Sequence, residues 1–154
     1  MKKIKIYLDT SVIGGCFDTE FKRYSNHLIK AILKGRAQAV LSTVVLAEVQ
    51  KAPSDVKGVL DQILDISEVL DIDSEMIALA EMYLKSAIVS RKYQDDALHI
   101  AAASVSKTDV LVSWNFKHIV NFKRIHQFNA VNLREGYSML EIRSPMEVIF
   151  DENS

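Results

Sequence analysis

The chain has 154 residues, the length of one domain, and it is 49% hydrophobic and 25% charged. This composition is typical of folded globular proteins and excludes a disordered or fibrous chain. The net charge of −1 excludes a protein that coats nucleic acid by bulk attraction, and the single cysteine, Cys16, excludes an intramolecular disulfide and a cysteine-based zinc site.

The N-terminal segment does not have the pattern of a signal peptide, because its apolar run is interrupted by Lys5 and ended by Asp9. No uncharged run elsewhere approaches the ~20 residues that a membrane-spanning helix needs. We therefore expect a cytoplasmic protein with no membrane partner. We also expect one domain over residues 1–150 and a short tail over residues 151–154.

Short apolar runs alternate along the chain with segments whose apolar residues are spaced as in helices. The runs predict strands at 4–8, 39–41, 69–72 and 110–113, and a last strand near Ala130 to Leu133. The spaced segments predict helices at 24–33, 44–51, 53–64, 76–89 and 95–106, and Gly14-Gly15 permits a turn before the first of these. This alternation predicts a three-layer α/β/α domain with a mostly parallel central sheet.

Charge is distributed unevenly. Residues 58–84 contain seven acidic residues and no Lys or Arg, whereas residues 110–134 contain basic residues and no Asp or Glu. The basic stretch is a candidate phosphate contact, and both stretches are also compatible with ordinary solvated faces.

Four polar residues from distant parts of the chain are expected at one edge of the sheet, because ligands of open parallel sheets bind beyond the carboxyl ends of the strands. Asp9 ends the first strand, and Asn115 follows the strand at 110–113. Glu48 lies on the helix after the second strand, and Asp96 lies in the first turn of its own helix. Taken singly, Asp9, Asp95 and Asp96 are better explained as turn and cap residues.

Glu48 is the least readily explained of these residues, because it lies within the apolar sequence Val44-Val-Leu-Ala-Glu48-Val. An ionised carboxylate removed from water needs a partner, and a divalent cation is one such partner. Two or three converging carboxylates suffice for Mg²⁺, which can then activate water for phosphodiester hydrolysis. The histidines, in contrast, show no zinc spacing: His27, His99, His118 and His126.

Four segments, taken together, resemble the PIN-domain ribonucleases, in particular the small single-domain group that includes VapC-type toxins. They contain, in the family's order across about residues 4–118, Ile6-Tyr-Leu-Asp9-Thr-Ser, Leu41-Ser-Thr-Val-Val-Leu-Ala-Glu48, Asp95-Asp96-Ala-Leu-His-Ile-Ala-Ala and Val110-Leu-Val-Ser-Trp-Asn115-Phe. The fourth segment departs from the family's pattern, because many relatives have Asp where this chain has Asn115. An Asn can still bind a cation through its side-chain oxygen or hold a metal-bound water.

The resemblance implies an endoribonuclease that depends on Mg²⁺ or Mn²⁺ and leaves 5′-phosphate and 3′-hydroxyl ends. It places the catalytic, metal-binding roles on Asp9, Glu48 and Asp96, with Asn115 as a further metal ligand. It also implies a homodimer and a small antitoxin that covers the site. Around the ligands we expect three supporting residues and a basic rim for RNA: Ser11, Asp95 and His99 for support, and Arg91, Lys92, Lys117, His118, Lys123 and Arg124 for the rim.

Two other functions remain open from the sequence. A catalytically weak PIN-like RNA-binding module is favoured by Asn115 and by the acidic run. A phosphatase that uses Asp9 as its nucleophile is the weaker alternative, because the acid expected two positions later is replaced by Ser11. Incubation of labelled RNA with Mn²⁺, and then with a chelator, separates a nuclease from a binding module.

Overall fold

The computed structural model describes residues 2–151, which fold around one sheet of five parallel strands in the order β3-β2-β1-β4-β5. Strand β1 lies at its centre, where Ile6 pairs with Ala39 on one side and with Val110 on the other. The strands are β1 (Lys5–Leu8), β2 (Gln38–Ser42), β3 (Glu68–Leu70), β4 (Val110–Val112) and β5 (Glu141–Arg143).

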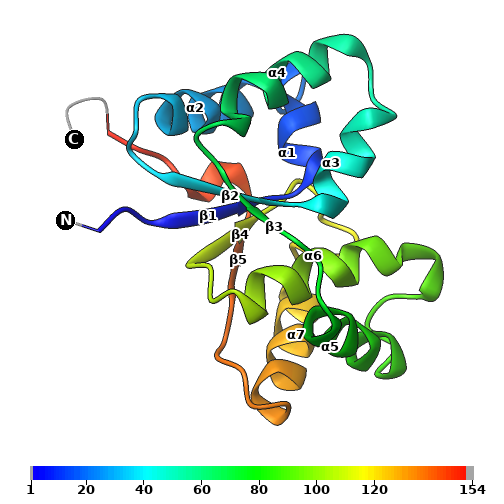
Figure 1. Ribbon diagram of the computed structural model, residues 1–154. Coiled ribbons are helices and arrows are strands. Elements are labelled where there is room, and N and C mark those ends of the chain that lie inside the picture. Colours follow the sequence, from blue (N-terminus) through cyan, green and yellow to red (C-terminus); the bar gives the residue numbers. More distant parts are fainter. Residues whose placement is uncertain (1, 152–154) are drawn as a thin grey trace.

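Helices cover both faces of the sheet, so that the predicted α/β/α architecture is confirmed and the sheet is parallel throughout (Figure 1). One face is covered by α1 (Thr10–Gly14), α2 (Lys22–Leu33), α3 (Thr43–Gln50) and α4 (Ser54–Leu64). The other face is covered by α5 (Ser74–Lys85), α6 (Gln94–Val105) and α7 (Phe122–Arg134). Short 3₁₀ turns lie at Gly15–Phe17, Arg91–Tyr93 and Pro145–Glu147.

The core lies on both faces of the two central strands. Ile6, Tyr7 and Leu8 of β1 are fully buried, as are Leu111 and Val112 of β4, which is why these strands are continuous apolar runs in the sequence. Among the described residues, no helix combines the length and the apolar character needed to cross a membrane.

The predicted strand near Ala130 to Leu133 is wrong, because these residues lie in α7. The buried positions Phe128, Asn129, Val131 and Asn132 follow the spacing of a helix rather than the alternation of a strand. The helix is capped by Asn121, whose side chain accepts a hydrogen bond from the Arg124 backbone N–H. The last strand is β5, which was not predicted from the sequence.

Two other segments differ from expectation. The helix predicted to extend to Val89 ends at Lys85, because Ala87 adopts a left-handed conformation with a φ of 57°. Gly14 and Gly15 do not form a reversal of the chain but continue α1 into a 3₁₀ turn. Of the predicted tail at 151–154, residues 152–154 lie outside the described part of the chain.

Candidate functional site

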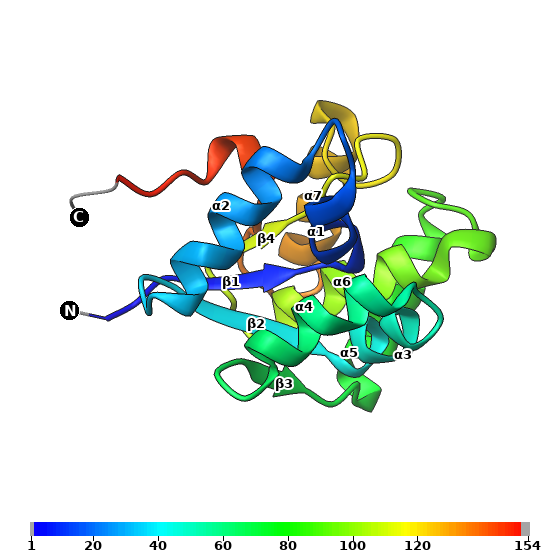
Figure 2. The same ribbon diagram turned by 90° about the horizontal axis from the view of Figure 1, so that it is seen from above.

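The predicted acidic residues lie at the edge of the sheet where the strands end. Asp9 directly follows β1, and Glu48 lies on α3, which begins at the residue after β2. Asp96 lies in the first turn of α6, and Asn115 follows β4. In Figure 2 the arrow of β1 points toward α1 and α3. Asp9, which follows this strand, therefore lies near the start of both helices.

Asp9 is only 4% exposed, and its carboxylate is held by two hydroxyl groups. Ser11 Oγ donates to Oδ1 over 2.6 Å, and Ser113 Oγ donates to Oδ2 over 2.5 Å. The backbone N–H groups of Trp114 and Asn115 donate to these two hydroxyl oxygens, which leaves each hydroxyl proton for Asp9. Burial raises the pKa of Asp9, and nearby His99 and the two serine hydroxyls oppose this rise only in part.

Glu48 is fixed by donors from two other elements. Thr10 Oγ1 donates to Glu48 Oε1 over 2.8 Å, and His99 Nε2 lies 2.8 Å from the same oxygen. Burial alone would raise the pKa of Glu48, but the hydrogen bond and charge of His99, together with Thr10, lower it overall. Glu48 is therefore the carboxylate of this group that is held in its charged form.

His99 is 2% exposed and continues this chain of contacts into the core. Its Nδ1 lies 2.7 Å from the hydroxyl of Tyr7, which in turn lies 2.7 Å from Ser42 Oγ. Burial lowers the pKa of His99, but the hydrogen bond with Glu48 and the charges of Asp9, Glu48 and Asp96 outweigh it, and the pKa is raised. Because His99 lies one turn after Asp96 on α6, its contact with Glu48 joins two of the acidic elements.

Asp96 is half-buried, and its pKa is raised to about 6. Burial is the largest cause, His99 opposes it, and the charges of Asp9, Glu48 and Asp95 raise the pKa further. These couplings place the three predicted catalytic carboxylates within electrostatic reach of one another. Asp95 itself is exposed.

Asn115 contacts Asp96 through its amide nitrogen, since Nδ2 donates to Asp96 Oδ2 over 3.3 Å. Its Oδ1 accepts the His118 backbone N–H at 2.9 Å, and this bond fixes which end of the amide faces Asp96. Asn115 thus joins the loop after β4 to the start of α6. Its side-chain oxygen is engaged in a turn rather than turned toward the carboxylates.

The residues of the predicted basic rim do not all lie together in the structure. Lys92 lies over the ring of Tyr93 at 5.6 Å, and the rings of Tyr93 and His118 are 4.1 Å apart, so one group forms beside Asp96 and Asn115. Lys117 precedes His118 and, after the effect of burial, lowers the pKa of that imidazole together with Arg124. Three of the predicted rim residues are placed otherwise: Arg91 pairs with Glu81, Arg124 donates to the Ile88 carbonyl, and Lys123 is exposed at the start of α7.

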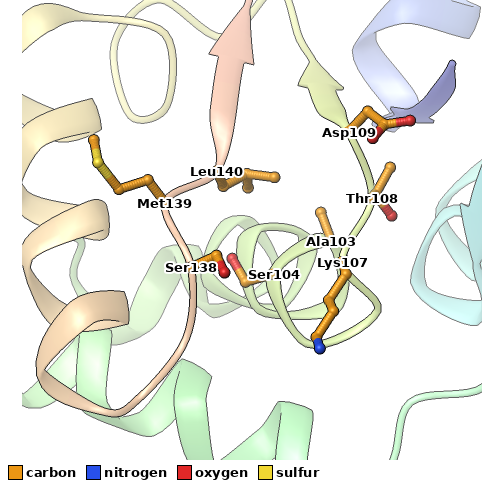
Figure 3. Close-up of a pocket in the computed structure, with 8 residues that line it drawn as sticks. All are labelled: Ala103, Ser104, Lys107, Thr108, Asp109, Ser138, Met139 and Leu140. Atoms are coloured by element: carbon orange, nitrogen blue, oxygen red, sulfur yellow. The ribbon is translucent and has the colours of Figure 1, made fainter.

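Two of the pockets among the described residues lie at opposite edges of the sheet. One, with a volume of about 420 Å³, adjoins the acidic residues and is lined by Ser11, Gly14, Gly15, Asp18, Phe21, Trp114 and Asn115. The other, shown in Figure 3, has a volume of about 270 Å³ and lies at the amino ends of β4 and β5, between Lys107–Asp109 and Ser138–Leu140. It contains none of the predicted site residues.

The donor set fits a hydrated Mg²⁺ or Mn²⁺ better than a metal in an all-protein cage. In the part of the chain that the structure describes, no three His, Cys, Asp or Glu side chains stand in a ready-made metal-binding group. Mg²⁺ keeps several of its waters and needs only one or two direct carboxylates, so a preformed cage is not required. A divalent cation would stabilise the charged form of the buried Asp9 carboxylate and would lower the raised pKa of Asp96.

Four polar residues around the site were not predicted from the sequence. Thr10 and Ser113 donate to the carboxylates of Glu48 and Asp9, Tyr7 contacts His99, and Ser42 contacts Tyr7. The available signal was weak. Ser113 is a polar residue at the end of a fully buried strand, and Tyr7 is a phenol within another, so each needs a hydrogen-bond partner inside the protein. The sequence does not indicate which partner each one finds.

Comparison with known proteins connects this arrangement to solved structures. No protein-family model and no curated protein matches the chain. The structure of VapBC2 from Rickettsia felis bound to a DNA fragment from its promoter is similar with a TM-score of 0.58 at 21% identity, over 92% of this chain and 98% of that one. VapBC-1 from nontypeable Haemophilus influenzae gives 0.57 at 16% identity, over 94% and 100% of the two chains.

FitAcB from Neisseria gonorrhoeae is also similar, with a TM-score of 0.56 at 17% identity, over 93% of this chain and 99% of that one. The likeness extends over nearly the whole of both chains in each case, although sequence identity is low. The chain therefore has the PIN-like α/β fold of the VapBC and FitAB structures, and the resemblance of its four sequence segments is confirmed at the level of the fold.

Proposed function

We propose that this chain is an endoribonuclease that depends on Mg²⁺ or Mn²⁺ and hydrolyses phosphodiester bonds of RNA. The observation that supports this most is the gathering of Asp9, Glu48 and Asp96 at one sheet edge, where burial and mutual repulsion raise the pKa of Asp96 to about 6. Such a group is unstable as a set of charged carboxylates and becomes favourable when a divalent cation is added. The likeness in fold to the VapBC and FitAB structures supports the same conclusion.

Asp9 and Asp96 would hold the cation, with Glu48 as the third carboxylate. The cation would supply positive charge for the scissile phosphate and lower the pKa of the attacking water. Ser11 and Ser113 orient the Asp9 carboxylate, and Thr10 and His99 orient Glu48, so these four side chains fix the acidic group before substrate arrives. Lys92 and His118, which meet at the ring of Tyr93, would contact the RNA backbone beside Asp96 together with the neighbouring Lys117.

Cleavage of labelled single-stranded RNA with Mn²⁺, and its loss in a chelator, tests the proposal. Asp96→Asn should lower the cleavage rate by more than about 100-fold, because a direct ligand matters more than the residues that orient it. The variant should remain folded, since it removes a carboxylate that is repelled by its neighbours. Asp61→Asn, at an exposed carboxylate on α4, is the matched control and should cleave at the rate of the unmodified protein.

If Asp96→Asn cleaved RNA at the wild-type rate, the acidic group would have no part in the reaction. Mn²⁺-independent RNA binding without cleavage would instead favour the second candidate, a catalytically weak RNA-binding module. One contact supports that candidate: Asn115 turns an amide nitrogen toward Asp96 where many relatives of the PIN family have a further carboxylate.

From the family resemblance we further propose that the chain forms a homodimer and is held inactive by a small antitoxin. The likeness to VapBC and FitAB structures supports such a partner. Light scattering on the purified chain measures its oligomeric state. Co-expression with a small protein encoded beside it, followed by the RNA cleavage assay, tests for inhibition by an antitoxin.

A further inference from the structure

The pocket next to the acidic group has aromatic walls that the proposed phosphodiester hydrolysis does not use. The rings of Phe21 and Trp114 stack with centroids 4.2 Å apart and an angle of 17° between their planes. Trp114 is only 6% exposed, whereas Phe21 is half-buried, so Phe21 is the ring that a ligand would meet first. The indole is locked in place because its Nε1–H donates to Ser25 Oγ over 2.8 Å.

Two residues that line the pocket also contact the acidic group. Ser11 lines the pocket and donates to Asp9, and Asn115 lines the pocket and donates to Asp96. A polynucleotide whose phosphate lay at the carboxylates would therefore bring a neighbouring base to this opening. The volume of about 420 Å³ lies within the roughly 300–1,000 Å³ range of small-molecule sites.

One charged side chain on the pocket wall can read the edge of a base. Asp18 lines the pocket and is exposed, and its Oδ1 accepts the Glu20 backbone N–H over 2.8 Å. A carboxylate accepts hydrogen bonds from the amino groups of adenine, cytosine and guanine. Uracil has no exocyclic amino group, and the one donor on its edge, N3–H, lies between two carbonyl oxygens that repel a carboxylate.

We propose that this pocket, formed by Phe21, Trp114 and Asp18, binds one unpaired nucleobase beside the scissile phosphate and selects bases with an exocyclic amino group over uracil. The inference rests on the proposed nuclease function, since it assigns a base-binding subsite to the same RNA substrate. Stacking on Phe21 supplies the affinity, because bases stack on aromatic rings regardless of sequence. Asp18 supplies the discrimination.

Titration with uncharged nucleosides, in a chelator and without RNA, tests the pocket separately from catalysis. Trp114 is the only tryptophan, so its indole N–H gives one signal in an NMR spectrum of the ¹⁵N-labelled protein. Adenosine, cytidine and guanosine should shift this signal, with a Kd at least about fivefold lower than that of uridine, the lower end of one good base-edge contact. Asp18→Asn should remove this difference, because an amide also donates to uracil O4.

Two pairs of variants control the measurement. Gly14→Leu should abolish the shifts by filling the pocket, because Gly14 has a helical φ of −62° and a Cβ there meets no heavy atom within 4 Å. Gly58→Leu, in the middle of α4 with the same open surroundings, should leave them unchanged. Asp55→Asn matches Asp18→Asn, since Asp55 is also exposed and accepts one backbone N–H, and it should keep the base preference.

The proposal is overturned if no nucleoside shifts the signal, or if the four nucleosides bind equally well. It is also overturned if N-acetyl-phenylalaninamide shifts the signal and nucleosides do not, since the pocket would then take a protein side chain. Nucleoside binding by a protein that cleaves no RNA would keep the pocket and reject the nuclease. Mn²⁺-dependent cleavage without nucleoside binding would keep the nuclease and reject the base-binding pocket.

Discussion

Tyr7 connects the fully buried centre of the sheet to the acidic residues at its edge. Its side chain is 0% exposed, and its hydroxyl lies 2.7 Å both from Ser42 Oγ and from His99 Nδ1. Burial is the main cause that raises the pKa of Tyr7, so the phenol stays neutral. The residue therefore orients His99, which in turn holds Glu48.

We predict that Tyr7→Phe lowers the free energy of unfolding by about 1–3 kcal/mol, because it leaves the Ser42 hydroxyl and His99 Nδ1 buried without this partner. Tyr137→Phe is the matched control, since the Tyr137 hydroxyl donates to the exposed carboxylate of Glu75 and water can replace it. That change should cost less than about 0.5 kcal/mol. Urea denaturation measures both, and equal losses for the two variants would contradict a structural role for the Tyr7 hydroxyl.

Asn115 is the residue at which the chain departs from the PIN pattern, and its effect is testable by restoring the acid. Asn115→Asp keeps an acceptor for the His118 N–H but replaces the donor to Asp96 with a negative charge. We predict Mn²⁺ affinity about tenfold tighter, or about 1.4 kcal/mol, because hard cations gain from added charge. Calorimetry that showed equal or weaker affinity would identify Asn115 as a residue that only connects the β4 loop to α6.

The types of the site residues could be predicted from sequence, but their partners could not. Asp9, Glu48 and Asp96 stand out because carboxylates at strand ends and in apolar helices have few explanations. Thr10 and Ser113 have many, since small hydroxyl residues are common at turns and caps. Their contacts with Glu48 and Asp9 bring together residues 38 and 104 positions apart, which no local pattern encodes.

At the scale of elements, Gly15 allows α1, α2 and the loop after β4 to pack closely. A Cβ on Gly15 would lie 2.6 Å from Ser25 Oγ and 2.8 Å from Trp114 Nε1. These two atoms are hydrogen-bonded to each other, and Ser25 also donates to the Val12 carbonyl over 2.7 Å. Because the φ of Gly15 is −61°, the need for glycine arises from packing and not from backbone strain.

We predict that Gly15→Ala destabilises the protein by about 1–3 kcal/mol through overpacking. Gly14→Ala should instead be neutral or stabilising by up to about 1 kcal/mol, since the adjacent position is helical and open. Thermal unfolding of the two variants, made one residue apart, measures the contrast. If both variants behaved alike, the close contact of Gly15 with Trp114 would not exist in solution.

Elements with a regular pattern could be predicted from sequence, and those fixed by distant contacts could not. The strands β1, β2 and β4 are buried on both faces, so their apolar runs identify them. In contrast, β5 buries only Ile142 of its three residues and is a strand because it pairs with β4. The segment Ala130 to Leu133 is apolar enough for a strand, and only the Asn121 cap and the full helical repeat of α7 exclude it.

At the scale of the whole molecule, several groups at the acidic edge gain protons on folding. The pKa of Asp9 is raised by burial, that of Asp96 is raised to about 6 mainly by burial, and that of His99 is raised overall despite its burial. Each group therefore binds protons more tightly in the folded state than in the unfolded state. The pKa of Glu48 is lowered, so its titration lies at more acidic pH.

These directions fix how metal-free stability depends on pH. When the folded state binds more protons than the unfolded state, the free energy of unfolding falls as pH rises. We therefore predict that the Tm in a chelator decreases steadily from about pH 5 to about pH 8. The share of Asp96 in this decrease falls between its ordinary pKa of 3.8 and its folded-state pKa of about 6, and it is nearly complete above that pH. Asp96→Asn removes one of the titrating groups, so its Tm should depend less on pH.

Mn²⁺ should oppose this decrease of Tm with pH, because it binds the deprotonated carboxylates of the folded state and competes with protons for them. At a fixed Mn²⁺ concentration the stabilisation grows as RT ln(1 + [Mn²⁺]/Kd), and the apparent Kd falls as pH rises. The Tm measured with Mn²⁺ should thus rise above the chelator curve, and the gap should widen from about pH 5 to about pH 8. A Na⁺ series at matched ionic strength controls for screening of the acidic group by salt. A chelator curve that is flat or rises with pH would show that these carboxylates are not mutually destabilising in solution, and a constant gap would show that Mn²⁺ binds elsewhere.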